Sequence, residues 1–229
     1  MQSQIKQLFI VFTLIFLCQT DLAATPSSNF NLKVGDLLFQ DLNCGTMCNG
    51  IGQVTYGIHN TYMSHVGMIV STKNNQPIII EAVTRGVVET PLADFLNQSL
   101  DDTGRPRVLV ERLVPSERKL IPAAVKYAKA QLGKPYNATF IPNSGKSYYC
   151  SELIYVAFWV ANKQQSIFHT NKMSFKDPYT GQVTADWNAY FTALKIPPPE
   201  GLIGTNPGML SRESVVQLVY QYGNLRIHH

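Results

Sequence analysis

The stretch SGKSYYCSELIYVAFWV, residues 144–160, decides how the rest of the chain is interpreted. Turn-forming residues lead directly into CSELIYVAFWVAN, a segment that is apolar on nearly every face of a helix and is therefore expected to be buried. Cys150 stands at the joint, as the first residue of this predicted helix. Cys150 is therefore either a core thiol that happens to begin a helix or an activated nucleophile. The second is possible because the partial positive charge of a helix N-terminus favours a thiolate.

The chain before this helix is rich in predicted strands. Short apolar or alternating runs bounded by turn residues predict strands within 33–42, 64–72, 78–83 and 107–113. The segment KNNQP predicts the turn of a hairpin, and GVVETPLADFL (86–96) predicts one more strand followed by a helical turn. The first half of the chain is therefore expected to form an antiparallel sheet.

Helices are expected mainly from the second half. LIPAAVKYAKAQLG (120–133) has Pro122 near its start and Gly133 as a stop, which is typical helix punctuation. Segment 163–210 is expected to be irregular, and SRESVVQLVYQYG (211–223) is expected to close the chain as a helix capped by Ser211. The pattern predicts an α+β fold.

The N-terminus has the features of a secretory signal. Lys6 precedes the apolar run Leu8–Cys18, and the small residues Ala23 and Ala24 offer a cleavage site. We therefore predict a signal peptide over 1–24, one domain over 25–229, and a secreted or periplasmic location. An uncleaved anchor, which would be the protein's single membrane contact, is the alternative; Phe16 and Leu17 before Cys18 argue against lipidation. The net charge of +4 includes no basic cluster, so nucleic-acid binding is not expected.

Three cysteines follow the signal peptide: Cys44, Cys48 and Cys150. A local Cys44–Cys48 disulfide would leave Cys150 free, while three reduced thiols are the alternative. Cys44, Cys48, His59 and His65 superficially resemble a zinc site, but the Cys–His spacing and the missing finger hydrophobics favour a disulfide. No metal or other cofactor is predicted.

A base and an orienting group for Cys150 can be found on the predicted hairpin. His65 opens an otherwise apolar strand, and Gly67 beside it leaves room for another group. Glu81 follows three isoleucines in the strand expected to pair with it, where a carboxylate is costly unless it is paired. A histidine at a strand end and a carboxylate on a solvated face are the alternatives. Together with Cys150 the two residues match the pattern of a catalytic triad.

The segments GDLLFQDLNCGTMCNGI, SHVGMIV, IIEAV, LGKPYN and YYCSELIYVAF, in this order, resemble the circularly permuted papain-like cysteine hydrolases of the YiiX/YaeF-like amidase group. These are permuted relatives of the NlpC-type cell-wall peptidases and of the lecithin–retinol acyltransferase group. The resemblance is strongest over about 32–161, and GLIGTNPGML near the end also fits.

The resemblance implies a permuted papain-like fold in which an antiparallel sheet or small barrel packs on a buried helix, and the histidine strand precedes the cysteine helix. Cys150 would be the nucleophile, His65 the base and Glu81 its orienting partner. Tyr136 and Tyr149 are candidates to line the cleft. Residues 163–229 would form a C-terminal extension, whose Trp187, Tyr190 and Phe191 are expected to fill a core rather than cover the cleft.

Three functions remain open at this point. The first is a secreted cysteine amidase or peptidase that acts through a thioester, with cell-wall peptides as candidate substrates. The second is a lipid esterase or acyltransferase that uses the same residues. The third is a catalytically silent binding module. The expected partner is a peptide or another small molecule that carries an acyl group.

Overall fold

The computed structural model describes residues 30–42 and 44–228, so the predicted signal peptide lies outside the described residues. The strands are β1 Leu37–Gln40, β2 His65–Ser71, β3 Ile78–Val83, β4 Gly86–Pro91, β5 Val108–Leu113, β6 Asn171–Lys172, β7 Ile203–Gly204 and β8 Val216–Gln221. The α-helices are α1 Thr46–Val54, α2 Leu92–Leu96, α3 Ile121–Lys129, α4 Cys150–Ala161, α5 Ala185–Leu194 and α6 Pro207–Leu210. Short 3-10 turns span Ile58–Asn60, Lys73–Asn75 and Arg118–Leu120.

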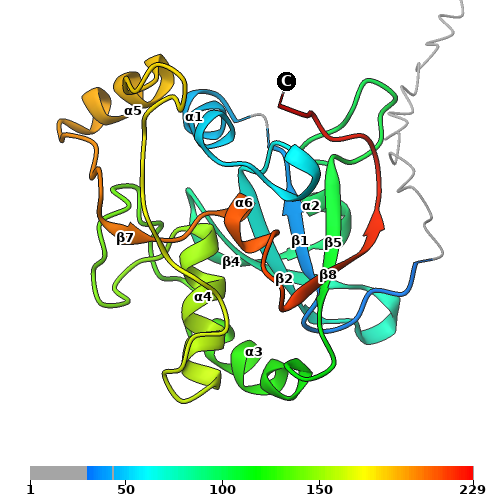
Figure 1. The fold of residues 1–229 in the computed structure, drawn as a ribbon. Coiled ribbons are helices and arrows are strands. Elements are labelled where there is room, and N and C mark those ends of the chain that lie inside the picture. Colours follow the sequence, from blue (N-terminus) through cyan, green and yellow to red (C-terminus); the bar gives the residue numbers. More distant parts are fainter. Residues whose placement is uncertain (1–29, 43, 229) are drawn as a thin grey trace, which may run out of the picture.

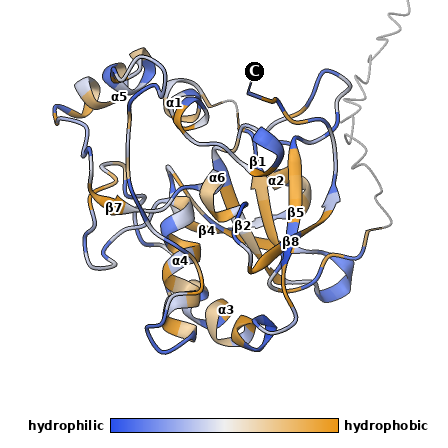
Figure 2. Ribbon diagram, viewed as in Figure 1, coloured by the Kyte–Doolittle hydropathy of each residue, from blue (hydrophilic) through white to orange (hydrophobic). Residues whose placement is uncertain are grey.

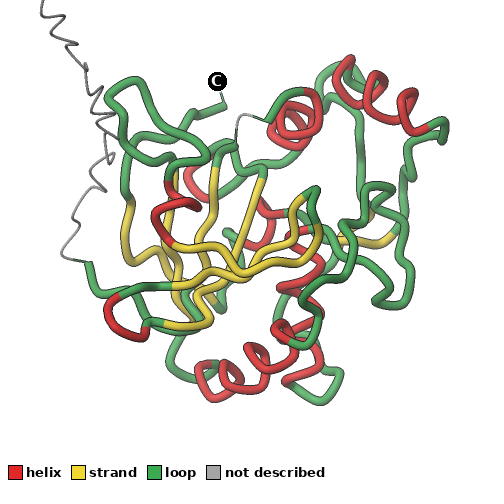
Figure 3. Tube along the Cα trace, turned by 180° about the vertical axis from the view of Figure 1, so that it is seen from behind, coloured by secondary structure: helices red, strands yellow, loops and turns green. Residues whose placement is uncertain are grey.

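One six-stranded sheet organises the molecule. Its order is β4-β3-β2-β1-β5-β8, and every neighbouring pair is antiparallel. Figure 3 shows these strands as one curved layer, with helices on its flanks. The predicted antiparallel sheet is confirmed, and so are the strands expected around β1 to β5.

Helix α4 packs against one face of the sheet, as Figure 1 shows. Side chains alternate between the two faces of a strand, so Leu37 and Phe39 of β1 share a buried cluster with Ile154 and Phe158 of α4. Leu38 lies in a second cluster on the opposite face, beside Ile69. Figure 2 shows hydrophobic residues along β1 and over much of α4. The prediction that α4 is a buried helix is confirmed.

Gly67 of β2 is required by close packing. A Cβ atom at this position would lie 2.4 Å from Cγ2 of Ile79 and 3.2 Å from the ring of Phe95. The space that Gly67 leaves is therefore filled by neighbouring side chains of β3 and α2. This packing fixes the strand that begins with His65.

The prediction of a closing helix over 211–223 is wrong. The segment contains β8, which adds to the edge strand β5, and Val216 is buried while Gln217 is exposed. Its apolar residues fit both a helical and a strand period, and the free edge of β5 selects the strand. Ser211 caps no helix there; its hydroxyl accepts from the Ile58 N–H at 3.0 Å and donates to the Gly208 carbonyl.

Segment 163–210 is more ordered than expected. It contains β6, β7, α5 and α6. The hydroxyl of Thr184 caps α5 by accepting from the Trp187 N–H at 3.3 Å, and Lys195 ends the helix in a left-handed conformation. Trp187 and Phe191 are buried in a core cluster with Ile51 of α1, as expected, but Trp187 also lines a cavity beside Cys150, which was not expected. Helix α1 itself was not expected from the sequence.

Within residues 30–42 and 44–228, no helix is both long enough and apolar enough to cross a membrane.

Candidate active site

Three chain segments bring the predicted site residues together. Cys150 is the first residue of α4, His65 the first of β2, and Glu81 lies in β3. Their exposed fractions are 4%, 4% and 1%, so all three are almost entirely withdrawn from water. Buried groups of this kind need specific partners.

Glu81 holds the histidine ring. The distance between His65 Nε2 and Glu81 Oε2 is 2.6 Å, which makes this a short, charge-assisted hydrogen bond. The other carboxylate oxygen of Glu81 accepts from the Thr90 hydroxyl at 2.5 Å and from Gln98 Nε2 at 3.4 Å. Both carboxylate oxygens thus accept hydrogen bonds, and the carboxylate cannot rotate away from the imidazole without breaking these bonds.

Cys150 lies beside the same imidazole, and both residues line one cavity. Because Nε2 is engaged by Glu81, the nitrogen that remains for the sulfur is Nδ1. Burial lowers the pKa of His65, but the hydrogen bonds and charges of Cys150 and Glu81 outweigh it and raise the pKa from 6.5 to about 10. Burial alone would raise the pKa of the Glu81 carboxyl, yet the bonds from His65, Thr90 and Gln98 keep it below its ordinary value.

The start of α4 is set by its neighbours. Tyr149 is extended, and its backbone N–H donates to Glu152 Oε2 at 3.3 Å, which satisfies one end of the first turn. The Glu152 carboxylate also accepts from Asn137 Nδ2 at 3.4 Å. This acidic side chain is therefore tied to the loop before the helix rather than to the sulfur of Cys150.

A cavity of about 380 Å³ opens beside the triad, and we call it the histidine cavity. Its walls include Cys150, His65 and Glu81. The disulfide between Cys44 and Cys48 forms a further part of the wall, and Cys150 is the one free cysteine among residues 30–42 and 44–228. The disulfide uses both cysteines of the zinc-like set Cys44, Cys48, His59 and His65, so these sulfurs are not available as thiolate ligands.

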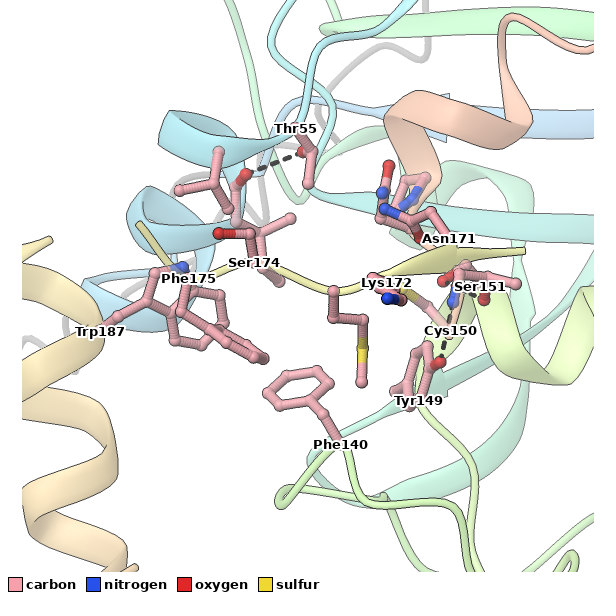
Figure 4. Close-up of a pocket in the computed structure, with 16 residues that line it drawn as sticks. Thr55, Phe140, Tyr149, Cys150, Ser151, Asn171, Lys172, Ser174, Phe175 and Trp187 are labelled. Carbon is pink, nitrogen blue, oxygen red and sulfur yellow. Dashed lines mark hydrogen bonds between the residues drawn. The ribbon is translucent and has the colours of Figure 1, made fainter. Parts of the chain in front are cut away.

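A smaller cavity of about 110 Å³ lies on another side of Cys150, and we call it the aromatic cavity. Phe140, Met173, Phe175 and Trp187 supply most of its apolar wall. Figure 4 shows Phe175 and Trp187 on one side of this space and Cys150 on the other. Cys150 lines both cavities, whereas His65 lines only the larger one.

The two predicted tyrosines take different places. Tyr136 lines the histidine cavity, and its hydroxyl contacts only the sulfur of Met47, at 3.8 Å, among the contacts described. Tyr149 lines the aromatic cavity and is buried, and its hydroxyl accepts from the Thr205 N–H at 3.1 Å. The Tyr149 hydroxyl is therefore already committed to the backbone of the segment after β7.

The sequence did not reveal Thr90 and Gln98 as partners of Glu81. Thr90 comes to the carboxylate through the β3–β4 hairpin, and Gln98 follows α2. Thr90 lies on β4, which pairs with the strand of Glu81, so the predicted strand over 86–91 was the signal that could have revealed Thr90 as a partner. The walls of the aromatic cavity come from the segment that was expected to be irregular.

The sequence of this chain also matches the model of a known protein family. The model of the permuted papain-like amidases YaeF/YiiX, the C92 family, covers residues 31–220. The chain belongs to this enzyme family. The resemblance noted from the sequence is thereby confirmed, and the protein is a papain-like amidase family member whose cysteine helix follows its histidine strand.

The fold is also similar to a solved structure, that of the metalloprotein YiiX from Escherichia coli O157:H7. The TM-score is 0.65 with 22% sequence identity, and the match covers 82% of this chain and 97% of that one. No curated protein shows a significant sequence match to this chain. YiiX is a metalloprotein, but within residues 30–42 and 44–228 of this amidase no cluster of three or more His, Cys, Asp or Glu could hold a metal ion.

Proposed function

We propose that this amidase is an exported cysteine hydrolase that cleaves an amide bond through a thioester on Cys150. The observation that carries the proposal is the 2.6 Å hydrogen bond between His65 and Glu81 in the wall of the cavity that Cys150 also lines. A nucleophile, a base and an orienting group in this order are what covalent acyl transfer needs.

The first half-reaction forms the acyl-enzyme. In this proposal the reaction starts from a thiolate on Cys150 and an imidazolium on His65, whose raised pKa keeps the ring protonated at neutral pH. The Cys150 sulfur attacks the amide carbonyl, and a C–S bond forms. As the C–N bond breaks, the imidazolium gives its proton to the leaving nitrogen, so an amine departs and the acyl group stays on the sulfur.

The second half-reaction consumes water. Neutral His65 takes a proton from a water molecule while the oxygen attacks the thioester carbonyl. The C–S bond then breaks, the acid leaves, and the thiolate–imidazolium pair is restored. Glu81 stays ionised throughout and stabilises each imidazolium stage, since its pKa is held below its ordinary value.

Two donors support the developing oxyanion in this proposal. The backbone N–H of Cys150 lies in the first turn of α4, where the N–H groups have no partner within the helix. Tyr136 is assigned as a substrate-binding residue, because its hydroxyl faces the same cavity with only a weak sulfur acceptor nearby. Burial and the neighbouring Cys150 raise the pKa of Tyr136 well above 10, so the hydroxyl keeps its proton and can donate.

Export and substrate class are also part of the proposal. The Cys44–Cys48 disulfide favours an oxidising compartment, and the signal-like residues 1–24 favour secretion. A peptide amide of the bacterial cell wall is the substrate class that the related NlpC-type enzymes suggest. A lipid ester is the competing substrate for the same residues.

The test begins with the thiol. Iodoacetamide treatment of the non-reduced protein, followed by peptide mapping, should modify Cys150 faster than a model thiol at pH 6. Peptidoglycan fragments and phospholipids are then compared as substrates with the unaltered protein and with Cys150→Ala. Amide cleavage that disappears in Cys150→Ala supports the proposal; cleavage of phospholipid alone, or full turnover by the variant, contradicts it.

A further inference from the structure

The two cavities beside Cys150 receive different parts of a substrate. His65 must protonate the leaving nitrogen, and it lines the histidine cavity but not the aromatic cavity. The leaving group therefore belongs in the histidine cavity. Whatever occupies the aromatic cavity remains attached to Cys150 after the C–N bond breaks, so this space faces the acyl side of the scissile bond.

We propose, on the basis of the proposed function, that the aromatic cavity is the specificity pocket for the acyl side of a peptide substrate. It takes the apolar side chain of the residue whose carbonyl is attacked. Asn171 accepts a hydrogen bond from the backbone N–H of that residue. The substrate class is an N-acylated amino acid or peptide with a leucine- or phenylalanine-sized residue before the cleaved bond.

The size of the cavity supports a single apolar side chain. Its volume of about 110 Å³ is somewhat smaller than the engineered core cavity of about 150 Å³ that binds benzene. A branched aliphatic side chain fills such a space, whereas most of a long fatty-acyl chain would extend beyond it.

The walls resist expansion. The rings of Phe175 and Trp187 meet edge to face with centroids 5.0 Å apart, and Phe140 meets Trp187 in the same way at 5.6 Å. Tyr149 is held on the other side by the Thr205 N–H. Admitting a larger group would break this packing, so the pocket selects by size.

Asn171 supplies an independent polar signal. It lines the aromatic cavity, and its Oδ1 atom is buried without a hydrogen-bond partner among the described residues. A buried acceptor without a donor is costly, and a substrate N–H next to the apolar side chain would satisfy it. Peptides carry this N–H, and simple fatty amides or esters do not. Figure 4 shows Asn171 near Cys150 at the edge of the cavity.

The test uses aminocoumarin amides with one leaving group and different acyl parts. N-acetyl-leucyl and N-acetyl-phenylalanyl amides should show kcat/KM at least tenfold above N-acetyl-glycyl. Dodecanoyl amide and 4-methylpentanoyl amide, which is leucine without its N–H, should both fall below the leucyl compound by tenfold or more. This series uses the unaltered protein and so does not depend on the folding of any variant.

Two variants locate the preference. Ser174→Phe, at an exposed position that lines the aromatic cavity, should narrow the cavity and lower the leucyl-to-glycyl ratio of kcat/KM by tenfold or more. Ser116→Phe, at an exposed turn that lines neither cavity, is the matched control and should change nothing. Asn171→Leu should lower the leucyl-to-4-methylpentanoyl ratio of kcat/KM about tenfold.

Alkylation separates this inference from the proposed function. Chloromethyl ketones of N-acetyl-leucine and N-acetyl-glycine react with Cys150 without any hydrolysis, and mass spectrometry gives both rates. A leucine preference in alkylation without any amide turnover would retain the pocket and overturn the hydrolase. Amide turnover with equal leucyl and glycyl rates, insensitive to Ser174→Phe, would overturn the pocket and retain the hydrolase.

Discussion

His65 and Glu81 are joined by a 2.6 Å hydrogen bond between Nε2 and Oε2, although they lie sixteen positions apart on neighbouring strands. The second oxygen of the Glu81 carboxylate accepts hydrogen bonds from Thr90 and Gln98. The orientation of the His65 ring is thereby fixed by a carboxylate that is itself held in place on both oxygens. Four predictions follow from this site and its surroundings.

The pH dependence of turnover should have a high alkaline limit. His65 acts as an acid toward the leaving group, and its pKa is raised to about 10, so activity should persist above pH 8 and fall as the pH passes about 10. A kcat/KM profile of a leucyl amide between pH 5 and 11 measures this limb. An activity loss centred near pH 6.5 would show that the partners of His65 do not raise its pKa.

Glu81→Gln should lower kcat/KM by about 10²-fold, because removing the orienting carboxylate of a triad costs up to about 10⁴-fold in rate. It should also move the alkaline limb to lower pH, since the charge of Glu81 helps to raise the pKa of His65. The two effects together distinguish loss of charge from misfolding. Glu89→Gln is the control: Glu89 is an exposed residue of β4 paired with Lys129, so the variant should retain both the rate and the alkaline limb.

Glu111 should be a pH-dependent weakness of the fold. It is fully buried in β5, neither of its carboxylate oxygens has a hydrogen-bond partner among the described residues, and burial raises its pKa to about 9. The folded protein therefore binds a proton that the unfolded chain loses near pH 4.5, and stability falls as the pH rises from about 4.5 toward 9.

Glu111→Leu should accordingly raise the free energy of unfolding at pH 8 by about 1–4 kcal/mol, because an apolar side chain replaces a buried, unpaired acid. Leu37 and Leu218 lie opposite this position on the adjacent strands. Urea unfolding at pH 8 and pH 4 measures the change, which should be much smaller at pH 4. An equal gain at both values would assign the effect to packing rather than to the proton.

Removing the Cys44–Cys48 disulfide should destabilise the protein only modestly. The bridge closes a loop of four residue steps, for which chain entropy suggests a loss of about 2 kcal/mol. The double variant Cys44→Ser/Cys48→Ser should unfold at lower urea and still show rapid alkylation of Cys150. A large loss of the Cys150 alkylation rate in a folded variant would show instead that the disulfide wall positions the nucleophile.

The sequence was sufficient to single out Cys150, His65 and Glu81, because each is a polar or reactive residue next to an apolar segment. Cys150 interrupts a turn at the start of an apolar helix, and Glu81 is an acid after three isoleucines. The strands that carry His65 and Glu81 are local and continuous, so their pairing could be predicted from one hairpin. Whether these residues act as nucleophile, base and orienting group stays a prediction that turnover of the variants must test.

Elements that depend on contacts between distant segments could not be predicted from the sequence. The segment of β8 was expected as a helix because Ser211 offers a cap, whereas the pairing with the edge strand β5 makes it a strand. Helix α5 carries a usable signal, with Thr184 as a cap before Trp187 and Phe191 four residues apart. That signal was missed because the prolines and glycines around it suggested an irregular segment.

The end of the described chain returns to the beginning of β2. Arg226 binds Asp41 at 2.6 and 2.8 Å, its carbonyl accepts from the Tyr62 N–H, and the His228 ring stacks on Tyr62 with centroids 3.7 Å apart. Tyr62 lies three positions before His65. During synthesis His65 therefore emerges early, but the segment that leads into it is secured only when residues 226–228 have been made. A chain that ends after α6 would carry Cys150, His65 and Glu81 but would lack these contacts to the segment before β2.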